Sequence, residues 1–420
     1  MFDIAERRAR LARRHRLALG HHAPDVVSAS DSLVCLHATD PATVYLSAWA
    51  RVDGLDTADV DKALYDDRSL VKHLCMRRTL FVFNTGMLGV IQAAVSERVA
   101  NQERRRLVKD VEKAGLYPDG TDWLAEASAA TLDELDALGE ASSTELRAAV
   151  PLLGGSLVYA PGKSYGGSVP IAPRVLTTLS AAGKILRGTN QGSWNVSRPR
   201  WVSTRRWLRT EPEVPAEVQA RADLVRRWLY AFGPATVTDI KWWLGSTMTA
   251  TRTALADIGA VEVELHGQPG VALADDLDPV QPVAPWAALL PGLDPTTMGW
   301  FEREWYLGAH RAALFDSTGN GGMTAWWDGR IVGGWNQTPT GEVYLQLLED
   351  IGSEAVTALE SQAARLTEWL GGLRVAPRFP SPLSSLPPRG TPDPRPGSGR
   401  TATHVLAGDA EFRSGTRLHP

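Results

Sequence analysis

The segment Leu36-His37-Ala38-Thr39-Asp40-Pro41 combines three side-chain types that can act on a water molecule. A neutral histidine can accept a proton from water, and a threonine hydroxyl can fix the orientation of that water. His37 and Thr39 flank a single alanine, so alternation along the chain directs both side chains to the same side. Asp40 is the one carboxylate beside them, and it stands where a helix cap would stand before Pro41.

The elements around this segment leave its role open. One helix is expected to end near Leu36 and the next to begin after Asp40, with His37 and Thr39 at the junction. The free amides at the start of the second helix create a positive potential that suits a bound water or anion. The same residues also fit a plain turn, in which Asp40 caps the helix while His37 and Thr39 close the loop. The residue types alone favour this second interpretation.

Three stretches of the chain share one order of parts: a short helix, a turn, a second helix and a β-ribbon. In the clearest copy, Thr236 caps a helix over 237–244, Gly245 ends it, and a second helix over 249–258 leads into a ribbon over 261–273. A helix-turn-helix followed by a hairpin is a winged helix. The other copies are expected at the following positions: helices from Pro41 and over 57–65 with a ribbon over 71–83 and a long helix to about 114, and helices over 143–150 and 171–184 with a ribbon over 185–202.

The pattern changes after residue 285. Asp328-Gly329 between two apolar runs predicts a hairpin, and a helix is expected over 353–370. After Ala376 the chain has eight prolines in twenty residues, so residues 381–420 are expected to be mostly disordered.

The charges are segregated along the chain, although the net charge of the 420 residues is only −4. Residues 1–20 hold six arginines against two acids, and residues 184–209 hold seven basic residues and no acid. Residues 255–300 hold seven acids and no lysine or arginine. Such segregation allows a positive groove on a weakly acidic protein. The alternative is that the arginines are scattered over solvated faces.

Several protein classes are excluded by what the sequence lacks. No phosphate loop, dinucleotide fingerprint, zinc-protease motif or Gly-x-Ser-x-Gly elbow is present, and no cofactor or metal is expected. His21-His22 lacks a third ligand nearby and is interpreted as a surface turn. Two cysteines make a disulfide framework implausible. Thr79–Ser96 is uncharged but contains Asn84-Thr85-Gly86, so it predicts strand, turn and helix rather than a membrane span.

Three groups of residues together resemble one family. Leu36 to Pro41, Met76-Arg77-Arg78-Thr79-Leu80, and Gly233-Pro234-Ala235-Thr236 with Asp239 and Trp242-Trp243 are similar to the tandem winged-helix DNA glycosylases, the AlkZ- and YcaQ-like group. The resemblance covers most of residues 5–375. It implies an α+β fold with three tandem winged-helix units in a C-shaped arrangement around a DNA channel, followed by a C-terminal β-hairpin and helix region.

The resemblance also implies an activity, hydrolysis of the N-glycosidic bond of alkylated purines in duplex DNA, including bulky or crosslinked N7 adducts. The family's signature is a Gln–apolar–Gln or Gln–apolar–Asp triplet, and the matching positions here are His37, Ala38 and Thr39. Neither glutamine is present. Under this interpretation His37 serves as a general base or water anchor, Thr39 assists it, and Asp40 stabilises the cationic sugar.

Arginines near these elements are the candidate DNA contacts, because phosphate contacts position a protein without reading sequence. Arg198 and Arg200 are two apart on a ribbon and are expected to face the same way, toward the trough that also holds His37. The full set of candidates is Arg13, Arg14, Arg16, Arg77, Arg78, Arg198, Arg200, Arg205 and Arg206.

The resulting organisation has five parts: a first winged-helix region with the triplet over 1–120, a second winged helix with the basic ribbon over 121–210, a third over 211–285, a β-rich region with a closing helix over 286–378, and a proline-rich tail over 379–420. The expected protein is a cytoplasmic, nucleoid-associated monomer that acts on damaged duplex DNA and does not bind membranes. Two alternatives stay open: a non-catalytic DNA-binding protein, either a regulator or a lesion-binding protein, and an assembly used only for protein contacts.

Overall fold

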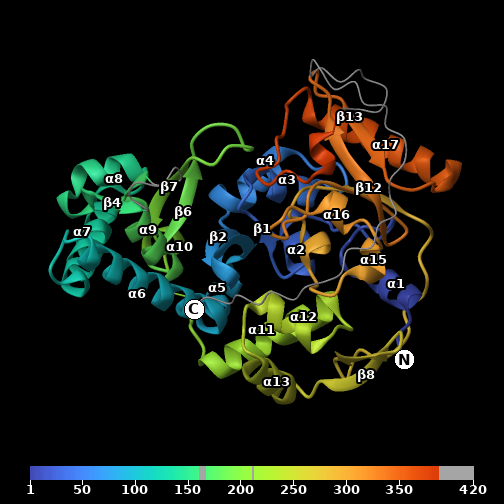
Figure 1. Ribbon diagram of the computed structural model, residues 1–420, viewed down its shortest axis with the longest axis horizontal. Coiled ribbons are helices and arrows are strands. Elements are labelled where there is room, and N and C mark those ends of the chain that lie inside the picture. The colour runs from blue at the N-terminus through green and yellow to red at the C-terminus, as the bar shows by residue number, and fades with distance from the viewer. Residues whose placement is uncertain (160–166, 211, 387–420) are drawn as a thin grey trace, which may run out of the picture. The chain divides into compact units, whose positions relative to one another are not determined.

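The chain folds into a mixed α+β structure of short helices and small antiparallel sheets (Figure 1). The computed structural model describes residues 1–159, 167–210 and 212–386. Every named strand pair in these residues is antiparallel, and most of them are hairpins of strands that follow one another in the chain.

The first unit is built around a three-stranded sheet in the order β1-β3-β2. Its elements are α1 (Ile4–Arg14), α2 (Val26–Ser32), β1 (Leu36–His37), α3 (Pro41–Trp49), α4 (Thr57–Asp61), a π-helical turn (Lys62–Asp66), β2 (Leu70–Cys75), a 3-10 turn (Met76–Arg78) and β3 (Thr79–Asn84). A second 3-10 turn (Thr85–Met87), α5 (Leu88–Ile91), a second π-helical turn (Gln92–Ser96) and α6 (Glu97–Lys113) follow. The prediction of strand, turn and helix over 79–96 is therefore confirmed.

The expectation that a helix ends near Leu36 is wrong. α2 ends at Ser32, Val34 adopts a left-handed φ of 64°, and Leu36 and His37 form an edge strand on β3. A short apolar run fits a buried helix end and a buried strand equally well, and here pairing with Val82 and Phe81 decided the outcome.

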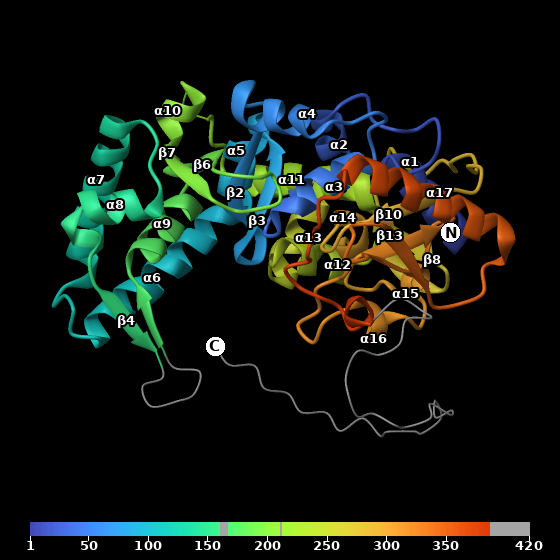
Figure 2. The same ribbon diagram turned by 90° about the horizontal axis from the view of Figure 1, so that it is seen from above.

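The second unit has a hydrophobic core of its own, which extends from Leu107 to Trp201. Its elements are α7 (Gly120–Leu138), α8 (Ser143–Ala149), β4 (Ser156–Tyr159), β5 (Gly167–Pro170), α9 (Ala172–Ala181), β6 (Ile185–Asn190), β7 (Pro199–Ser203) and α10 (Thr204–Leu208). Ser142 and Glu145 form the predicted capping box. The β4–β5 hairpin was not predicted, and in Figure 2 it extends beyond α6 and α7.

The third unit follows the prediction closely. α11 (Glu217–Phe232) precedes α12 (Val237–Leu244), α13 (Met248–Asp257), β8 (Val261–Leu265) and β9 (Gln268–Ala272). Thr236 and Asp239 cap α12 reciprocally, and Gly245 leaves the helix at a φ of 60°, a conformation that glycine adopts without strain.

The last unit is a four-stranded sheet in the order β10-β11-β12-β13, covered by α17. Its elements are β10 (Ala287–Leu290), α14 (Pro295–Met298), α15 (Glu304–Leu307), α16 (Arg311–Leu314), β11 (Thr324–Trp327), β12 (Arg330–Gln337), β13 (Val343–Leu347) and α17 (Gly352–Leu370). The predicted hairpin at Asp328-Gly329 and the predicted helix over 353–370 are confirmed.

Part of the expected disordered tail is folded. Ser381 and Leu383 are buried, a 3-10 turn spans Leu383–Ser385, and Asn336 donates a hydrogen bond to the carbonyl of Ser384 at 2.7 Å. Residues 387–420 lie outside the described part of the chain. The proline count overlooked Leu383, which packs with the main core.

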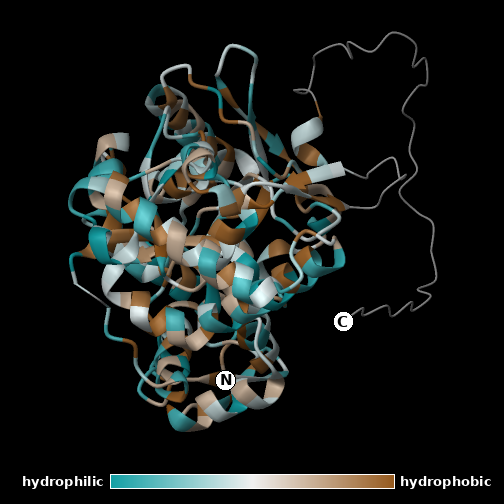
Figure 3. Cartoon of the chain, turned by 90° about the vertical axis from the view of Figure 1, so that its left-hand side faces the viewer, coloured by the Kyte–Doolittle hydropathy of each residue, from teal (hydrophilic) through white to brown (hydrophobic). Residues whose placement is uncertain are grey.

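One core joins the first, third and last units and also takes in Leu186, Val202 and Trp207 of the second unit, whose remaining buried residues form a separate core. Along the helices, hydrophobic and hydrophilic residues alternate on the same ribbons, as amphipathic helices on a shared core require (Figure 3). A fully buried ion pair between Arg51 and Asp294, with Nη2 to Oδ1 at 2.8 Å, ties the C-terminal end of α3 to the start of α14. The five predicted domain boundaries stay predictions.

Candidate active site

His37 is held by the edge strand and is nearly enclosed. Its side chain is 8% exposed, and its ring meets Phe81 edge-on at 5.1 Å between centroids. Nδ1 accepts a hydrogen bond from the amide of Thr39 at 3.4 Å, which places the proton of the neutral ring on Nε2. Burial, and then the charge of Arg77, lower the pKa of His37 to about 3. The ring is therefore a neutral hydrogen-bond donor at ordinary pH and a weak base.

Asp40 caps α3 and is anchored from a second direction. Its Oδ1 accepts the amide of Ala42 at 3.1 Å, and its Oδ2 accepts the amide of Arg378 at 3.0 Å. The Arg378 guanidinium also donates to the carbonyl of Thr39 at 3.1 Å. The loop that carries the triplet is thus fixed by α3 on one side and by the segment after α17 on the other. Sequence reasoning missed Arg378 because it lies among the prolines.

The strand register separates His37 from Ala38. His37 pairs with Phe81, whereas Ala38 lies next to Leu80 on the opposite face of the sheet. Ala38 lines a small cavity with Lys72 and Arg187.

Two cations are held in that cavity behind the triplet. Lys72 donates to the Tyr65 hydroxyl at 2.6 Å, and Arg187 lies over Trp201. Burial lowers the pKa of Lys72 to about 8 and that of Arg187 to about 10, in each case with a further contribution from a neighbouring arginine.

The strand register also affects the prediction that His37 shares an arginine-lined trough with Arg198 and Arg200. The cavity behind Ala38 also contacts Ser197 and Pro199 of the basic ribbon, but neither His37 nor Thr39 lines it. His37 instead shares its surroundings with Arg77. Among the arginines predicted as DNA contacts, the one whose charge acts on His37 is therefore Arg77 of the β2–β3 hairpin and not Arg198 or Arg200 of the β6–β7 ribbon.

Most predicted DNA contacts of the second unit are already paired. Arg200 binds Glu145 at 3.1 Å, Arg205 binds Asp136 at 2.6 Å, and Arg206 donates to the Asp136 carbonyl at 3.4 Å. Arg198 is exposed just before β7. Its backbone amide donates to Asn190 and its carbonyl accepts the amide of Gln191, whereas its guanidinium makes no ion pair with a described residue. The two arginines therefore differ as candidate DNA contacts, because Arg200 is paired with Glu145 while Arg198 is exposed.

The N-terminal arginines are engaged inside the molecule. Arg14 binds Asp276 at 2.6 Å and donates to the carbonyls of Tyr230 and Gly233. Arg16 donates to the carbonyl of His21 at 3.4 Å, and the Arg13 Nε is buried without a hydrogen-bond partner among the described residues. The basic start of the chain therefore binds part of the acidic stretch over 255–300.

Arg77 and Arg78 lie at the tip of the β2–β3 hairpin. Arg77 is exposed as a residue, but its guanidinium is largely desolvated where it stacks on Trp242, 4.1 Å from the ring centroid. Arg78 binds Glu103 at 3.0 Å. Both have left-handed φ values, 54° and 59°, at positions that usually favour glycine or asparagine.

The exposed side of α6 was not predicted as a DNA contact. Its basic residues are visible in the sequence as a run after Glu103, and their helical spacing brings several of them to the exposed side: Arg98, Arg104, Arg105, Arg106 and Lys109. A count of charge by helix would have found them.

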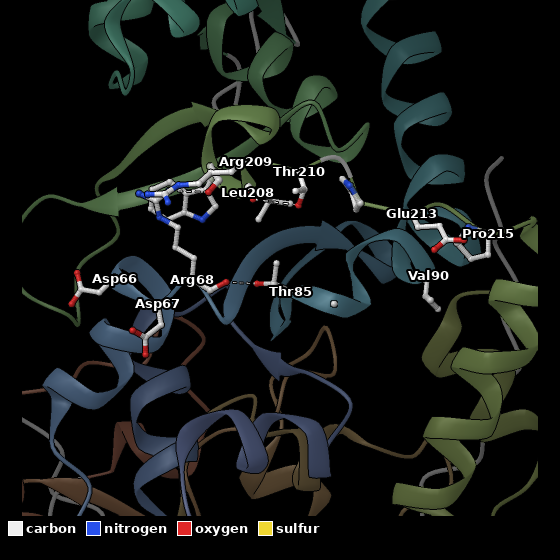
Figure 4. A pocket seen from close by; sticks show the side chains of 13 residues that line it. Asp66, Asp67, Arg68, Thr85, Val90, Leu208, Arg209, Thr210, Glu213 and Pro215 are labelled. Carbon is white, nitrogen blue, oxygen red and sulfur yellow. Dashed lines mark hydrogen bonds between the residues drawn. The ribbon is translucent and has the colours of Figure 1, made fainter.

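The larger cavities lie elsewhere. One of about 710 Å³ is lined by side chains of both signs, among them Asp66, Arg68, Arg209 and Glu213, and Figure 4 shows Thr85 bonded to the Arg68 carbonyl on its wall. Neither His37 nor Thr39 contributes to it. Cavity volume alone would have pointed away from the triplet.

The remaining candidate features are a metal site, the two cysteines and a membrane span. His22 binds Asp53 at 2.7 Å, and within the described ranges no three histidine, cysteine or acidic residues gather as a metal site would require. Cys35 and Cys75 are buried and free. No helix in the described ranges has the length and apolar character that a membrane crossing needs.

Comparison with known proteins gave three matches. A family model described as "DNA glycosylase AlkZ-like" matches residues 31–369. The "Interstrand DNA cross-link repair glycosylase" of Streptomyces sahachiroi is 26% identical over 176 residues, which is 40% of this chain and 47% of that protein, so the match spans about half of the relative. The solved structure of Streptomyces sahachiroi DNA glycosylase AlkZ has a TM-score of 0.68 at 21% identity, over 89% of this chain and 98% of that one.

Proposed function

Because the chain belongs to the AlkZ-like DNA glycosylase family, we propose that it hydrolyses the N-glycosidic bond of alkylated purines in duplex DNA, with a water placed by His37 and Thr39. The observation that carries the proposal is the state of His37: a neutral ring, with its proton on Nε2, at the first position of the family's triplet. The glutamine side chain that the family places there also ends in an N–H donor, so the histidine preserves the donor.

Hydrolysis of this glycosidic bond requires the protein mainly to position the water and the sugar. In an N7-alkylated guanine the bond from C1′ to the purine breaks with its electron pair moving onto the cationic ring, which leaves neutral. The water oxygen then bonds to C1′ and releases a proton to solvent. A donor on His37 and the Thr39 hydroxyl orient that water, while the charge of Asp40 favours the cationic sugar.

The weak basicity of His37 narrows its role. A ring with a pKa of about 3 holds and orients water but accepts a proton poorly. We therefore assign His37 as a water anchor and not as a general base. Asp40 acts mainly as the cap of α3, because both of its oxygens accept backbone amides.

The duplex is bound, in this proposal, by the helix–helix–hairpin units acting as three winged helices around a channel. Arg77, Arg198 and the exposed side of α6 are the foremost phosphate contacts, since they lie exposed at the surface. Arg13, Arg14, Arg16, Arg78, Arg200, Arg205 and Arg206 stay weaker candidates because most of them already bind protein groups.

The test is release of base from DNA carrying N7-alkylguanine, measured as abasic sites under single-turnover conditions. His37→Ala should lower the rate about a hundredfold while leaving DNA binding intact, because the water loses its anchor. His37→Gln should retain most of the rate, since its amide restores the donor. His310→Ala serves as the matched control, because that ring faces Glu349 in the last unit and makes no contact with His37 or Thr39.

A second candidate function has a specific observation in its favour. None of the three residues is a good base: His37 stays neutral, and Asp40 is engaged by two amides. A non-catalytic DNA-binding protein would bind duplexes in a salt-dependent way and release no base. Equal, slow release by the wild type and His37→Ala would favour this candidate.

A further inference from the structure

Arg303 is buried without a partner for its charge. The residue is 3% exposed, and its Nε and Nη1 atoms make no hydrogen bond with any described residue. Its guanidinium carbon lies 5.2 Å from the ring centroid of Trp242 and 4.8 Å from that of Phe315. Burying an uncompensated cation destabilises a fold, so an anion from another molecule would stabilise Arg303 at this position.

The carboxylate of Asp239 lies nearby, but it accepts hydrogen bonds from other groups. Asp239 holds the segment before Arg303 by accepting the amides of Phe301 at 2.8 Å and Glu302 at 2.9 Å, and it closes the cap of α12 with Thr236. No ion pair joins it to Arg303 in the described part of the chain. Within the described part of the chain the guanidinium contacts two aromatic rings, and cation–π contacts are weaker than an ion pair with a desolvated anion.

Arg77 reaches the same tryptophan from the hairpin tip. Its guanidinium carbon lies 4.1 Å from the Trp242 centroid, and it makes no ion pair with a described residue. The charge of Arg303 is one of the causes that lower the pKa of Arg77 to about 10, after burial. Two like charges thus converge on one ring, and the strained φ of Arg77 shows that its side chain is kept at a backbone position that favours glycine.

One member of the pair, Arg77, lies near the candidate chemistry. Arg77 is the neighbour whose charge acts on the His37 ring, and His37 is the candidate anchor of the attacking water. A phosphodiester bound by both guanidiniums would offset their repulsion, and through Arg77 it would bring the neighbouring sugar toward that ring. A phosphate also matches the planar donor groups of arginine in geometry.

We propose that Arg303 and Arg77, stacked on Trp242, form a seat for one phosphodiester of the DNA strand, next to the nucleotide presented to His37. This inference rests on the proposed function for the identity of that nucleotide, but the seat itself is a binding site that can be tested without turnover. Arg303 acts as a positioning residue, and Trp242 is its platform.

The experiment neutralises one phosphate at a time. A series of duplexes, each with a single methylphosphonate at a different position around the lesion, is titrated with the full-length protein. In the wild type one position near the lesion should weaken binding about tenfold, because a charge-assisted contact is lost. In Arg303→Gln the same methylphosphonate should have no further effect, and the slope of log K against log salt should fall by about 1.

Two further variants and a control make the result specific. Arg303→Lys should keep the salt slope because it keeps the charge, and Arg77→Gln should lose the response to the same phosphate. Thermal unfolding of each variant checks that it folds as the wild type does. Arg365→Gln is the matched control, since that arginine also lies over a tryptophan, Trp49, but on α17. It should behave as the wild type.

The outcomes separate the two proposals. If both Arg303→Gln and Arg77→Gln keep the methylphosphonate profile of the wild type, the proposed phosphodiester seat is wrong, whatever the rate of base release. A profile that loses the same position in both variants supports it. If the wild type shows that profile but releases no base from any adduct, the seat stands and the proposed glycosylase function fails.

Discussion

At the residue scale, the environment of His37 decides what the triplet can do. The strand places the ring against Phe81 and beside Arg77, and both burial and that charge disfavour the protonated form. A histidine at the same position in a solvated turn would titrate near pH 6.5 and serve as a base. Here it stays neutral, so an anchoring role follows from the surroundings and not from the residue type.

This gives a pH prediction. The pKa of His37 falls from its ordinary 6.5 to about 3 in the folded chain. Base release should therefore be flat from about pH 8 to about pH 5, because the neutral ring persists across that range. In single-turnover measurements, a rate that halves near pH 6.5 would contradict the neutral anchor.

The same shift bears on stability. Between about pH 6.5 and about pH 3 the unfolded chain binds more protons at this residue than the folded chain does. The contribution of the neutral ring to stability is therefore complete above pH 6.5 and is lost as the pH falls through that window. His73, whose pKa burial lowers to about 4, adds to the effect in the same direction.

At the scale of elements, one buried ion pair fixes the position of α3 and, with it, the loop that carries the triplet before α3. Arg51 at the C-terminal end of α3 binds Asp294 with both amino groups, and Asp294 also accepts the Ser47 hydroxyl at 2.7 Å. Arg51 further donates to the carbonyl of His15 at 3.0 Å. These bonds join the N-terminal segment, α3 and the start of α14 into one rigid support for the triplet.

Breaking this pair should destabilise the whole protein. Asp294→Ala leaves the Arg51 charge buried without its partner, which should lower the free energy of unfolding by about 3–5 kcal/mol. Asp223→Ala, which removes the partner of Arg227 in a partly exposed pair, should change it by about 0.5 kcal/mol. Denaturant unfolding monitored by tryptophan fluorescence checks both values, and equal effects would show that the buried pair is not a structural link.

At the scale of the whole molecule, part of the segregated charge is paired within the protein. Arg10 and Arg14 of the basic start both bind Asp276 of the acidic stretch, and Arg226 of α11 binds Asp275 of the same stretch. The regional count of charge therefore overstates the positive surface available for DNA. The α6 side and Arg198 gain importance for the same reason.

A pair of variants tests this account. Arg198→Ala should weaken duplex binding and reduce the slope of log K against log salt by about 1, because it removes an exposed charge that has no ion-pair partner among the described residues. Arg200→Ala should leave that slope nearly unchanged, since Arg200 is already paired with Glu145. Titrations at several salt concentrations measure both, and identical slopes for the two variants would show that the ion pair opens on DNA.

The sequence by itself determined the local elements. Capping residues at Thr236 and Ser142, the exit at Gly245, and the turn at Asp328-Gly329 act through neighbouring residues in the chain, so their signals are readable without the fold. The order of helix, helix and ribbon was predicted for the same reason.

The tertiary structure decided how the site is assembled. The strand at His37, the contact of Arg378 with Thr39, and the meeting of Arg77 and Arg303 on Trp242 all join residues far apart in the chain. Burial and like-charge proximity, which set the state of His37, depend on those long-range contacts. No spacing along the sequence reports them, because the free energy that selects them comes from packing of the whole core.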